Sequence, residues 1–246
     1  VMIFKKQTDM IELKNGESVS LTNGSQAKVV KELGRGGQGI VYLVEVGGQK
    51  MALKWYFNNM GNWFYSNLEE NISKGAPSEA FLWPEYLTTK QKGTYGYVMK
   101  LRPKDYYEFG QYLLARAKFK SFEAMVNAAM KICEGFKALH LSGLSYQDLN
   151  DGGFFIDTRS GDVLVCDCDN VAADGDNFGI GGMPGFMAPE VVRGIAKPDV
   201  LTDRYSLAVV LFKLFFRGDP LEGSKVLQCV VMTEENDLIH YGKDPV

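Results

Sequence analysis

The segment that decides the fold reads GRGGQGIV at residues 34–41. Its glycines follow the spacing G-x-G-x-x-G, and the apolar residues 40–46 predict a β-strand directly after them. A dinucleotide-binding loop with the same glycines opens a helix instead, which disfavours that class of site. Glycines let backbone N–H groups approach phosphate oxygens because no Cβ stands in the way. The segment therefore predicts either a phosphate-binding loop or a plain glycine hairpin.

The next predicted strand, residues 51–55, carries Lys54. A lysine on such a strand neutralises phosphate charge when a carboxylate on the following helix orients it, and otherwise it is solvated. Residues 62–73 predict that helix, whose buried face is expected to carry Tyr65, Leu68 and Ile72. Glu69 shares this face, so we predict that Glu69 partners Lys54. In the alternative, Glu69 and Glu70 are both surface glutamates.

Further motifs follow in a fixed order. Residues 146–149 read YQDL, Asp167 ends a strand predicted at 163–166, residues 186–190 read FMAPE, and residues 203–208 read DRYSLA. Together with the glycine loop and Lys54, these motifs resemble those of eukaryotic-like protein kinases over roughly residues 30–220. The chain is similar to a divergent, bacterial-type serine/threonine branch of that superfamily.

The resemblance implies a site for Mg-ATP. In it, Asp148 accepts the proton of the substrate hydroxyl, Lys54 and Glu69 orient the phosphates, and Asp167 binds Mg²⁺. Asp203 is expected to hold the catalytic loop in place. The implied nucleotide contacts are the loop glycines, the residues that sandwich the purine and the hinge that meets adenine: Gly34, Gly36, Gly37, Gly39, Val41, Ala52, Lys54, Met99, Lys100, Leu101, Arg102 and Phe155.

Three catalytic-loop residues depart from the family pattern. Gln147 replaces the arginine before the catalytic aspartate, Asn150 replaces a lysine, and Gly153 replaces the second metal-binding asparagine. One lost contact of this kind lowers a rate by about 10²–10³. The resemblance therefore implies a weak enzyme.

The residues after Asp167 suggest a compensation for Gly153. The family's D-F-G motif reads Asp167-Cys168-Asp169 here, which adds a carboxylate. We predict Asp169 as a second metal ligand, because Mg²⁺ prefers oxygen ligands. The alternative is a solvated loop residue. Further candidates for the same role are Asn150, Asp151 and Asn170.

The segment from Asp167 to Glu190 bears on regulation. It contains no Ser, Thr or Tyr, and Gln147 stands where an arginine would receive a phosphate. We therefore predict activity that is independent of phosphorylation in this segment and is set by a ligand or partner. The alternative is a permanently ordered segment without regulation.

Composition and charge exclude several other classes. The net charge of −3 gives no basic field for nucleic acid, and the apolar stretch 207–216 is too short to span a bilayer. The N-terminal residues lack the apolar run of a signal peptide, and four cysteines form no disulfide framework. We expect a cytoplasmic protein without a nucleic-acid or membrane partner. Cys166 and Cys168 are expected to be buried strand thiols rather than a metal half-site.

Local patterns predict three further features. Ser121 is a typical N-cap before an apolar helical pattern that runs to Leu139. Residues 80–88 predict a strand, and residues 152–165 predict a short hairpin.

The predicted fold is α+β and two-lobed, with a β-rich N-lobe and a shortened, mainly helical C-lobe. The expected segments are an N-terminal extension packing on the N-lobe (1–24), the N-lobe (25–103) and the C-lobe (104–246). The predicted function is transfer of the γ-phosphate of Mg-ATP to Ser or Thr of a protein substrate. The main alternative is a pseudokinase that binds nucleotide or acts as a scaffold for a regulatory partner, and a small-molecule kinase comes third. The sequence predicts no oligomeric state.

Overall fold

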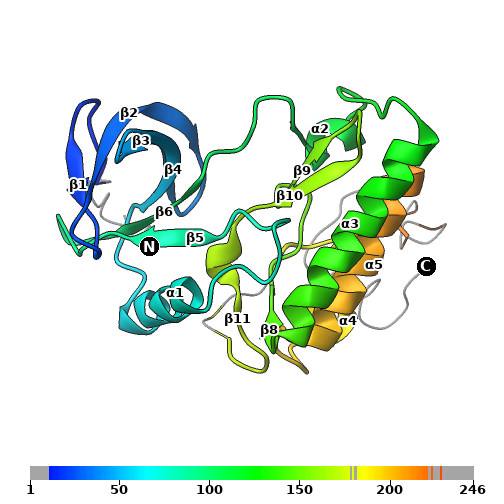
Figure 1. Ribbon diagram of the computed structural model, residues 1–246. Helices are drawn as coiled ribbons and strands as arrows, with labels where there is room; N and C mark the ends of the chain where they lie inside the picture. Colours follow the sequence, from blue (N-terminus) through cyan, green and yellow to red (C-terminus); the bar gives the residue numbers. More distant parts are fainter. Residues whose placement is uncertain (1–10, 178, 180–181, 221–222, 224–227, 229–246) are drawn as a thin grey trace. The chain divides into compact units, whose positions relative to one another are not determined.

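The computed structural model describes residues 11–177, 179, 182–220, 223 and 228. The chain divides into two compact units (Figure 1). The first unit comprises Val1–Gly75 and Trp83–Arg102, and the second comprises Ala76–Leu82 and Pro103–Val246. Strands predominate in the first unit and helices in the second, which confirms the predicted α+β class.

The first unit is built on a six-stranded antiparallel sheet in the order β1-β2-β3-β4-β6-β5 (Figure 1). Its strands are β1 (Ser18–Ser20), β2 (Gln26–Arg35), β3 (Gly39–Val46), β4 (Gln49–Tyr56), β5 (Pro84–Leu87) and β6 (Gly96–Lys100). One helix, α1 (Asn62–Lys74), packs against β5. The strands predicted around residues 40–46 and 51–55 and the helix predicted at 62–73 are confirmed.

Strand register sorts the side chains of this sheet onto two faces. Successive residues of a strand point to opposite faces, so the core residues Ile40, Tyr42 and Val44 alternate with Val41 and its neighbours. The cluster on the first face also takes Met51, Leu53, Trp55 and Val98 from β4 and β6. The predicted nucleotide-binding side chains lie on the opposite face. Lys54 pairs with Val41 and Ala52 pairs with Met99, and paired residues of neighbouring strands share a face. Ala52 and Lys54 are two residues apart on β4, so all four side chains are on the same side of the sheet.

Two glycines allow close approach of the backbones beside β4. A Cβ at Gly39 would lie 2.2 Å from the carbonyl oxygen of Trp55, and a Cβ at Gly96 would lie 2.3 Å from that of Lys54. Real Cβ atoms do not approach backbone oxygens so closely. The last glycine of the loop motif is therefore required by sheet packing.

The second unit centres on two long helices, α3 (Phe122–Leu141) and α5 (Val200–Phe216), which lie side by side (Figure 1). The hydroxyl of Ser121 accepts a hydrogen bond from Ala124 N at 3.1 Å, which confirms the predicted N-cap of α3. Asp199 and Thr202 form a capping box at the start of α5. The remaining elements are α2 (Phe109–Leu113), α4 (Pro189–Val192), β7 (Tyr107–Glu108), β8 (Leu144–Ser145), β9 (Phe154–Asp157), β10 (Asp162–Val165), the 3-10 helix η1 (Cys168–Asn170) and β11 (Ala172–Ala173).

The hairpin predicted at residues 152–165 is confirmed as β9 and β10. The strand predicted at 80–88 is only partly correct, because its first residues belong to the other unit. Leu82 N donates to Val165 O at 2.8 Å and Val165 N donates to Ala80 O at 2.7 Å. Residues 80–82 therefore attach to β10, and only β5 continues into the first sheet. No helix within the described part of the chain is long and apolar enough to cross a membrane.

Substitution of Gly39 tests the close packing beside β4. Gly39→Ala is expected to destabilise the protein by about 1–3 kcal/mol, because the new methyl group would overlap the Trp55 carbonyl. Gly36→Ala is the matched control, since its Cβ would meet no described atom within 4 Å, and we expect a change within about 0.5 kcal/mol. Urea unfolding followed by tryptophan fluorescence measures both, and equal midpoints would contradict the packing argument.

Candidate functional site

The glycine loop joins β2 to β3. Gly36 N donates to Gly39 O at 2.9 Å, which closes the turn. A Cβ at Gly34, Gly36 or Gly37 would meet no described atom within 4 Å, and none of the three has a positive φ. The fold therefore does not itself require these three glycines. The open space over their backbone is the kind of cradle that a phosphate group fills.

Lys54 lies on β4 opposite Val41 and Tyr97. Its side chain is 8% exposed, and its Nζ lies 5.8 Å from the centre of the Tyr56 ring, within the range of a cation–π contact. At the end of β6, Met99 is buried and Lys100 is exposed. The predicted hinge residues thus follow directly from the strand that pairs with Lys54.

The prediction that Glu69 shares the buried face of α1 is wrong. Glu69 and Glu70 are both exposed, and Glu70 pairs with Lys74 at 2.7 Å on the surface. The surface-glutamate alternative therefore describes their positions. A role for Glu69 beside Lys54 has no support from burial.

The buried face of α1 is rotated by about one residue from the predicted one. Its members follow the i, i+3, i+4, i+7 spacing and are Phe64, Asn67, Leu68 and Asn71. Two of them, Asn67 and Asn71, carry uncharged amides, whereas the prediction considered only carboxylates as partners of Lys54. The pair Phe64 and Leu68 at i, i+4 was the signal in the sequence that could have located this face.

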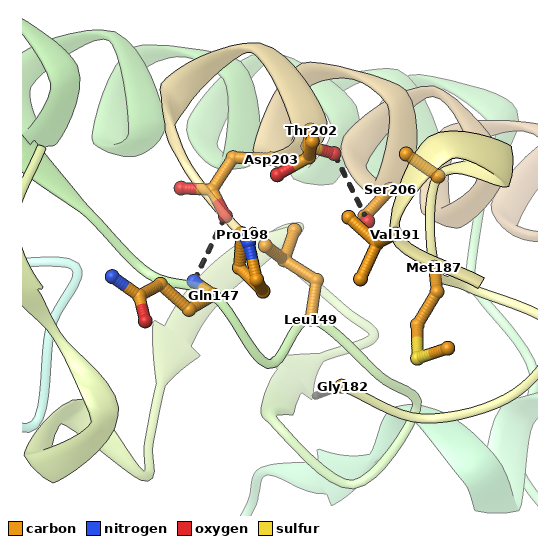
Figure 2. Close-up of a pocket in the computed structure, with 10 residues that line it drawn as sticks. Gln147, Leu149, Gly182, Met187, Val191, Pro198, Thr202, Asp203 and Ser206 are labelled. Carbon is orange, nitrogen blue, oxygen red and sulfur yellow. Dashed lines mark hydrogen bonds between the residues drawn. The ribbon is translucent and has the colours of Figure 1, made fainter. Parts of the chain in front are cut away.

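Asp203 holds the backbone of Tyr146 and Gln147, in the segment that the resemblance identifies as the catalytic loop. Its Oδ2 accepts from Tyr146 N at 2.6 Å. Its Oδ1 accepts from Gln147 N at 2.8 Å, and Figure 2 shows this second hydrogen bond. His140 Nε2 lies 3.1 Å from the same Oδ2. The Asp203 side chain is 1% exposed, and hydrogen bonds to a buried carboxylate are stronger than those between neutral groups. The start of α5 therefore fixes the backbone just before Asp148.

A small cavity lies beside this anchor, at the residues drawn in Figure 2. It is lined by Gln147, Leu149, Gly182, Met187, Ala188, Val191, Pro198, Thr202, Asp203 and Ser206. Its volume is about 10 Å³, which is close to the minimum for a single water molecule. The cavity is too small to be the site of a nucleotide or of a peptide side chain.

Gln147 connects the catalytic loop to the segment that follows η1. Its Nε2 donates to Ser145 Oγ at 2.9 Å and to Asp176 O at 2.5 Å, while its Oε1 accepts from Asn177 Nδ2 at 2.9 Å. The residue has a φ of 72°, a strained conformation typical of functional loops. The neutral amide of Gln147 thus binds this segment directly. An arginine at the same position would bind it through a phosphate group. The sequence shows that the family's arginine is replaced by Gln147, but it did not predict this contact.

Two amides orient the carboxylate of Asp148. Asn150 Nδ2 lies 3.4 Å from Asp148 Oδ1, and Asn170 Nδ2 lies 3.3 Å from Asp148 Oδ2. Asn150 also donates to Asp148 O at 2.9 Å and accepts from Gly152 N at 2.9 Å. Asn150, which stands at the position of the family's lysine, therefore makes hydrogen bonds within its own loop.

Tyr146 takes the place before Gln147. It is fully buried, and its hydroxyl donates to Cys166 O. Burial, reinforced by the nearby thiols and carboxylates, raises the pKa of Tyr146 well above its ordinary value, so the hydroxyl remains a donor. This hydrogen bond ties the catalytic loop to the end of β10, directly before Asp167.

The candidate metal ligands surround η1. Asp167 precedes it with a φ of 53° and is half-buried. Asp169 lies inside it and is 0% exposed, so the alternative of a solvated loop residue is wrong, while its role as a ligand stays a prediction. Within the described ranges, no three His, Cys, Asp or Glu side chains converge on a metal position. A cation here would therefore need amide, phosphate or water oxygens as well.

The two cysteines beside Asp167 are buried, as predicted, but neither lies on a strand, because Cys166 follows β10 and Cys168 belongs to η1. Cys166 Sγ lies 3.4 Å from Gly152 O, and Cys168 Sγ lies 3.4 Å from Val165 O. Both thiols thus contact backbone carbonyls, which suits structural thiols better than metal ligands.

Comparison with known proteins assigns the family. The family model of the protein kinase domain matches residues 27–241. The chain is 26% identical over 216 residues, 86% of its length, to a probable serine/threonine-protein kinase of Dictyostelium discoideum. It is 30% identical over 112 residues, 44% of its length, to mouse protein kinase C delta type. The matched regions span only 15% and 16% of those two relatives.

A solved structure agrees in fold. The kinase domain of PknI from Mycobacterium tuberculosis, crystallised as a double mutant, matches with a TM-score of 0.62 and 23% identity. The match covers 86% of this chain and 81% of the other. The chain therefore belongs to the protein kinase domain family and has that family's α+β fold, with a β-sheet N-lobe and a helical C-lobe.

Proposed function

We propose that this protein binds Mg-ATP and transfers the γ-phosphate to a Ser or Thr hydroxyl of a protein substrate. The observation that carries the proposal is the position of Asp148. Its loop is fixed by the buried carboxylate of Asp203, and its own carboxylate is oriented by Asn150 and Asn170. A general base needs this kind of fixed geometry, because proton transfer requires hydrogen-bond contact with the attacking hydroxyl.

Each residue has a role that its own chemistry allows. Asp148 accepts the hydroxyl proton as the substrate oxygen attacks the phosphorus. Lys54 and the N–H groups of the glycine loop bind and orient phosphate oxygens. Asp167 would hold Mg²⁺, with Asp169 as the second predicted ligand, and the bound ion neutralises charge on the phosphates. The buried amide oxygen of Asn170, which has no partner among the described residues, fits a cation at this place.

The pseudokinase alternative rests on specific observations. Glu69 is exposed, the position of the family's lysine holds the neutral Asn150, and Gly153 has no side chain. Each loss removes a contact worth about 10²–10³ in rate. We therefore expect slow transfer, and a scaffold that binds nucleotide without transfer is the second candidate.

The finer assignments are part of the same proposal. They comprise the divergent, bacterial-type Ser/Thr branch, a cytoplasmic location, and a protein substrate or regulatory partner. The relatives at 26% and 30% identity carry serine/threonine or protein kinase names, which supports the substrate class.

Nucleotide binding is tested by thermal unfolding. Mg-ATP at 100 times its Kd should stabilise the wild-type protein by about 2.7 kcal/mol, because only the folded state binds it. Lys54→Met should reduce this stabilisation, since the phosphates lose a cation. Lys50→Met, on the exposed end of the same strand, is the matched control and should respond like wild type. No shift of the wild-type midpoint at millimolar Mg-ATP would refute nucleotide binding.

Transfer is tested with radiolabelled γ-phosphate and a mixture of protein substrates. Asp148→Asn should lower the rate by about 10²–10⁴-fold, because the base is lost while nucleotide binding remains. Asp105→Asn, on an exposed side chain that pairs with Arg159, should leave the rate unchanged. Binding without transfer in the wild-type protein would favour the scaffold over the enzyme.

Regulation is tested by phosphatase treatment and by Gln147→Leu. Treated and untreated protein should show equal activity, because the segment after η1 is held by an amide rather than by a phosphate. Gln147→Leu removes these hydrogen bonds and should speed limited proteolysis near Asp176. Gln111→Leu, on the exposed side of α2, should not. A loss of activity on phosphatase treatment would contradict this account.

A further inference from the structure

Asn170 carries an unusual polar atom. The residue is 3% exposed, and its Oδ1 has no hydrogen-bond partner within the part of the chain that is described. An unpaired buried carbonyl oxygen is costly, so native structures rarely retain one without a water, an ion or a function. Among the described side chains, this is the buried N or O atom that stands out in this way.

The orientation of the Asn170 amide is set by Asp148. Asn170 Nδ2 lies 3.3 Å from Asp148 Oδ2. A carboxylate accepts and does not donate, so the NH₂ group must face Asp148. Exchanging the two ends of the amide would place two oxygens against each other. The unpaired oxygen is therefore a consequence of the contact with the catalytic base.

Position 153, where the family's metal-binding amide is expected, is crowded by Tyr146. A Cβ at Gly153 would lie 3.1 Å from the hydroxyl of Tyr146 and 3.5 Å from Asn150 O. The Tyr146 hydroxyl is itself fixed by its hydrogen bond to Cys166 O. A side chain at position 153 would therefore press on Tyr146, and Gly153 itself supplies no amide oxygen, so a ligand of that kind must come from another element.

We propose that Asn170 Oδ1 is a ligand of the divalent cation that accompanies the nucleotide, supplied from η1 in place of a side chain at Gly153. The proposal rests on the proposed function. Amide oxygens are hard ligands of the type that Mg²⁺ and Mn²⁺ bind, and the nucleotide phosphates and water complete such a shell. A cation on Oδ1 also polarises the amide, which strengthens the hydrogen bond from Nδ2 to Asp148. Metal binding and orientation of the base are thereby coupled through one side chain.

The test measures binding of Mn²⁺ rather than activity. Mn²⁺ is titrated by electron paramagnetic resonance, alone and with a non-hydrolysable ATP analogue. Asn170→Leu keeps the size of the side chain but removes the oxygen, and it should weaken Mn²⁺ binding by at least about 10-fold. Asn170→Asp keeps an oxygen ligand, so it should bind Mn²⁺ at least as tightly as wild type, whereas Asn170→Leu should not. Asn127→Leu, on an exposed asparagine of α3, is the matched control and should bind like wild type.

The outcomes separate this inference from the proposed function. Equal Mn²⁺ binding by Asn170→Leu and wild type would overturn the inference and leave a buried water as the partner of Oδ1. Absence of Mn²⁺ binding to wild type that still binds the nucleotide would overturn it as well. Failure to bind the nucleotide would refute the proposed function, while the titration with Mn²⁺ alone still compares the variants. Should Asn170→Leu not fold, Asn170→Ala is compared in the same way.

Discussion

The buried carboxylate of Asp203 is the interaction on which the arrangement of the second unit depends. It accepts hydrogen bonds from two successive backbone N–H groups, at Tyr146 and Gln147, and lies beside His140. These contacts compensate the cost of burying a charge and hold Gln147 at a positive φ. The backbone on either side is thereby directed, with Tyr146 towards the end of β10 and Asp148 towards the amides of Asn150 and Asn170.

The replacements around this anchor form a consistent set. A Cβ at position 153 would lie 3.1 Å from the Tyr146 hydroxyl, a tight contact that glycine avoids. Gln147 replaces a charge-dependent contact by neutral hydrogen bonds to residues 176 and 177. Gln147 thereby binds the segment after η1 without an arginine or a phosphate. Gln147 and Asn150 replace an arginine and a lysine of the family pattern, and this loss of positive charge explains why slow transfer is expected.

The sequence predicted what depends on motifs and local signals. The Ser121 cap and the hairpin of β9 and β10 follow from residue type and spacing, and the role of Asp203 follows from the resemblance to protein kinases. The buried face of α1 was missed because burial there involves Asn67 and Asn71, and uncharged amides give no apolar periodicity. The attachment of residues 80–82 to β10 depends on hydrogen bonds between segments far apart in the chain, which no local pattern encodes. The contacts of Gln147 and Asn170 are tertiary for the same reason.

Amide hydrogen exchange at Tyr146 and Gln147 tests the role of Asp203 most directly. Asp203→Asn keeps the shape of the side chain, but its NH₂ group cannot accept a hydrogen bond. A bond to a charged acceptor contributes about 1.5–3 kcal/mol, so exchange at one or both amides should accelerate by about 10–100-fold. Exchange in the first unit should stay unchanged, and Asp105→Asn should behave like wild type. Unaltered protection of both amides in Asp203→Asn would contradict the account.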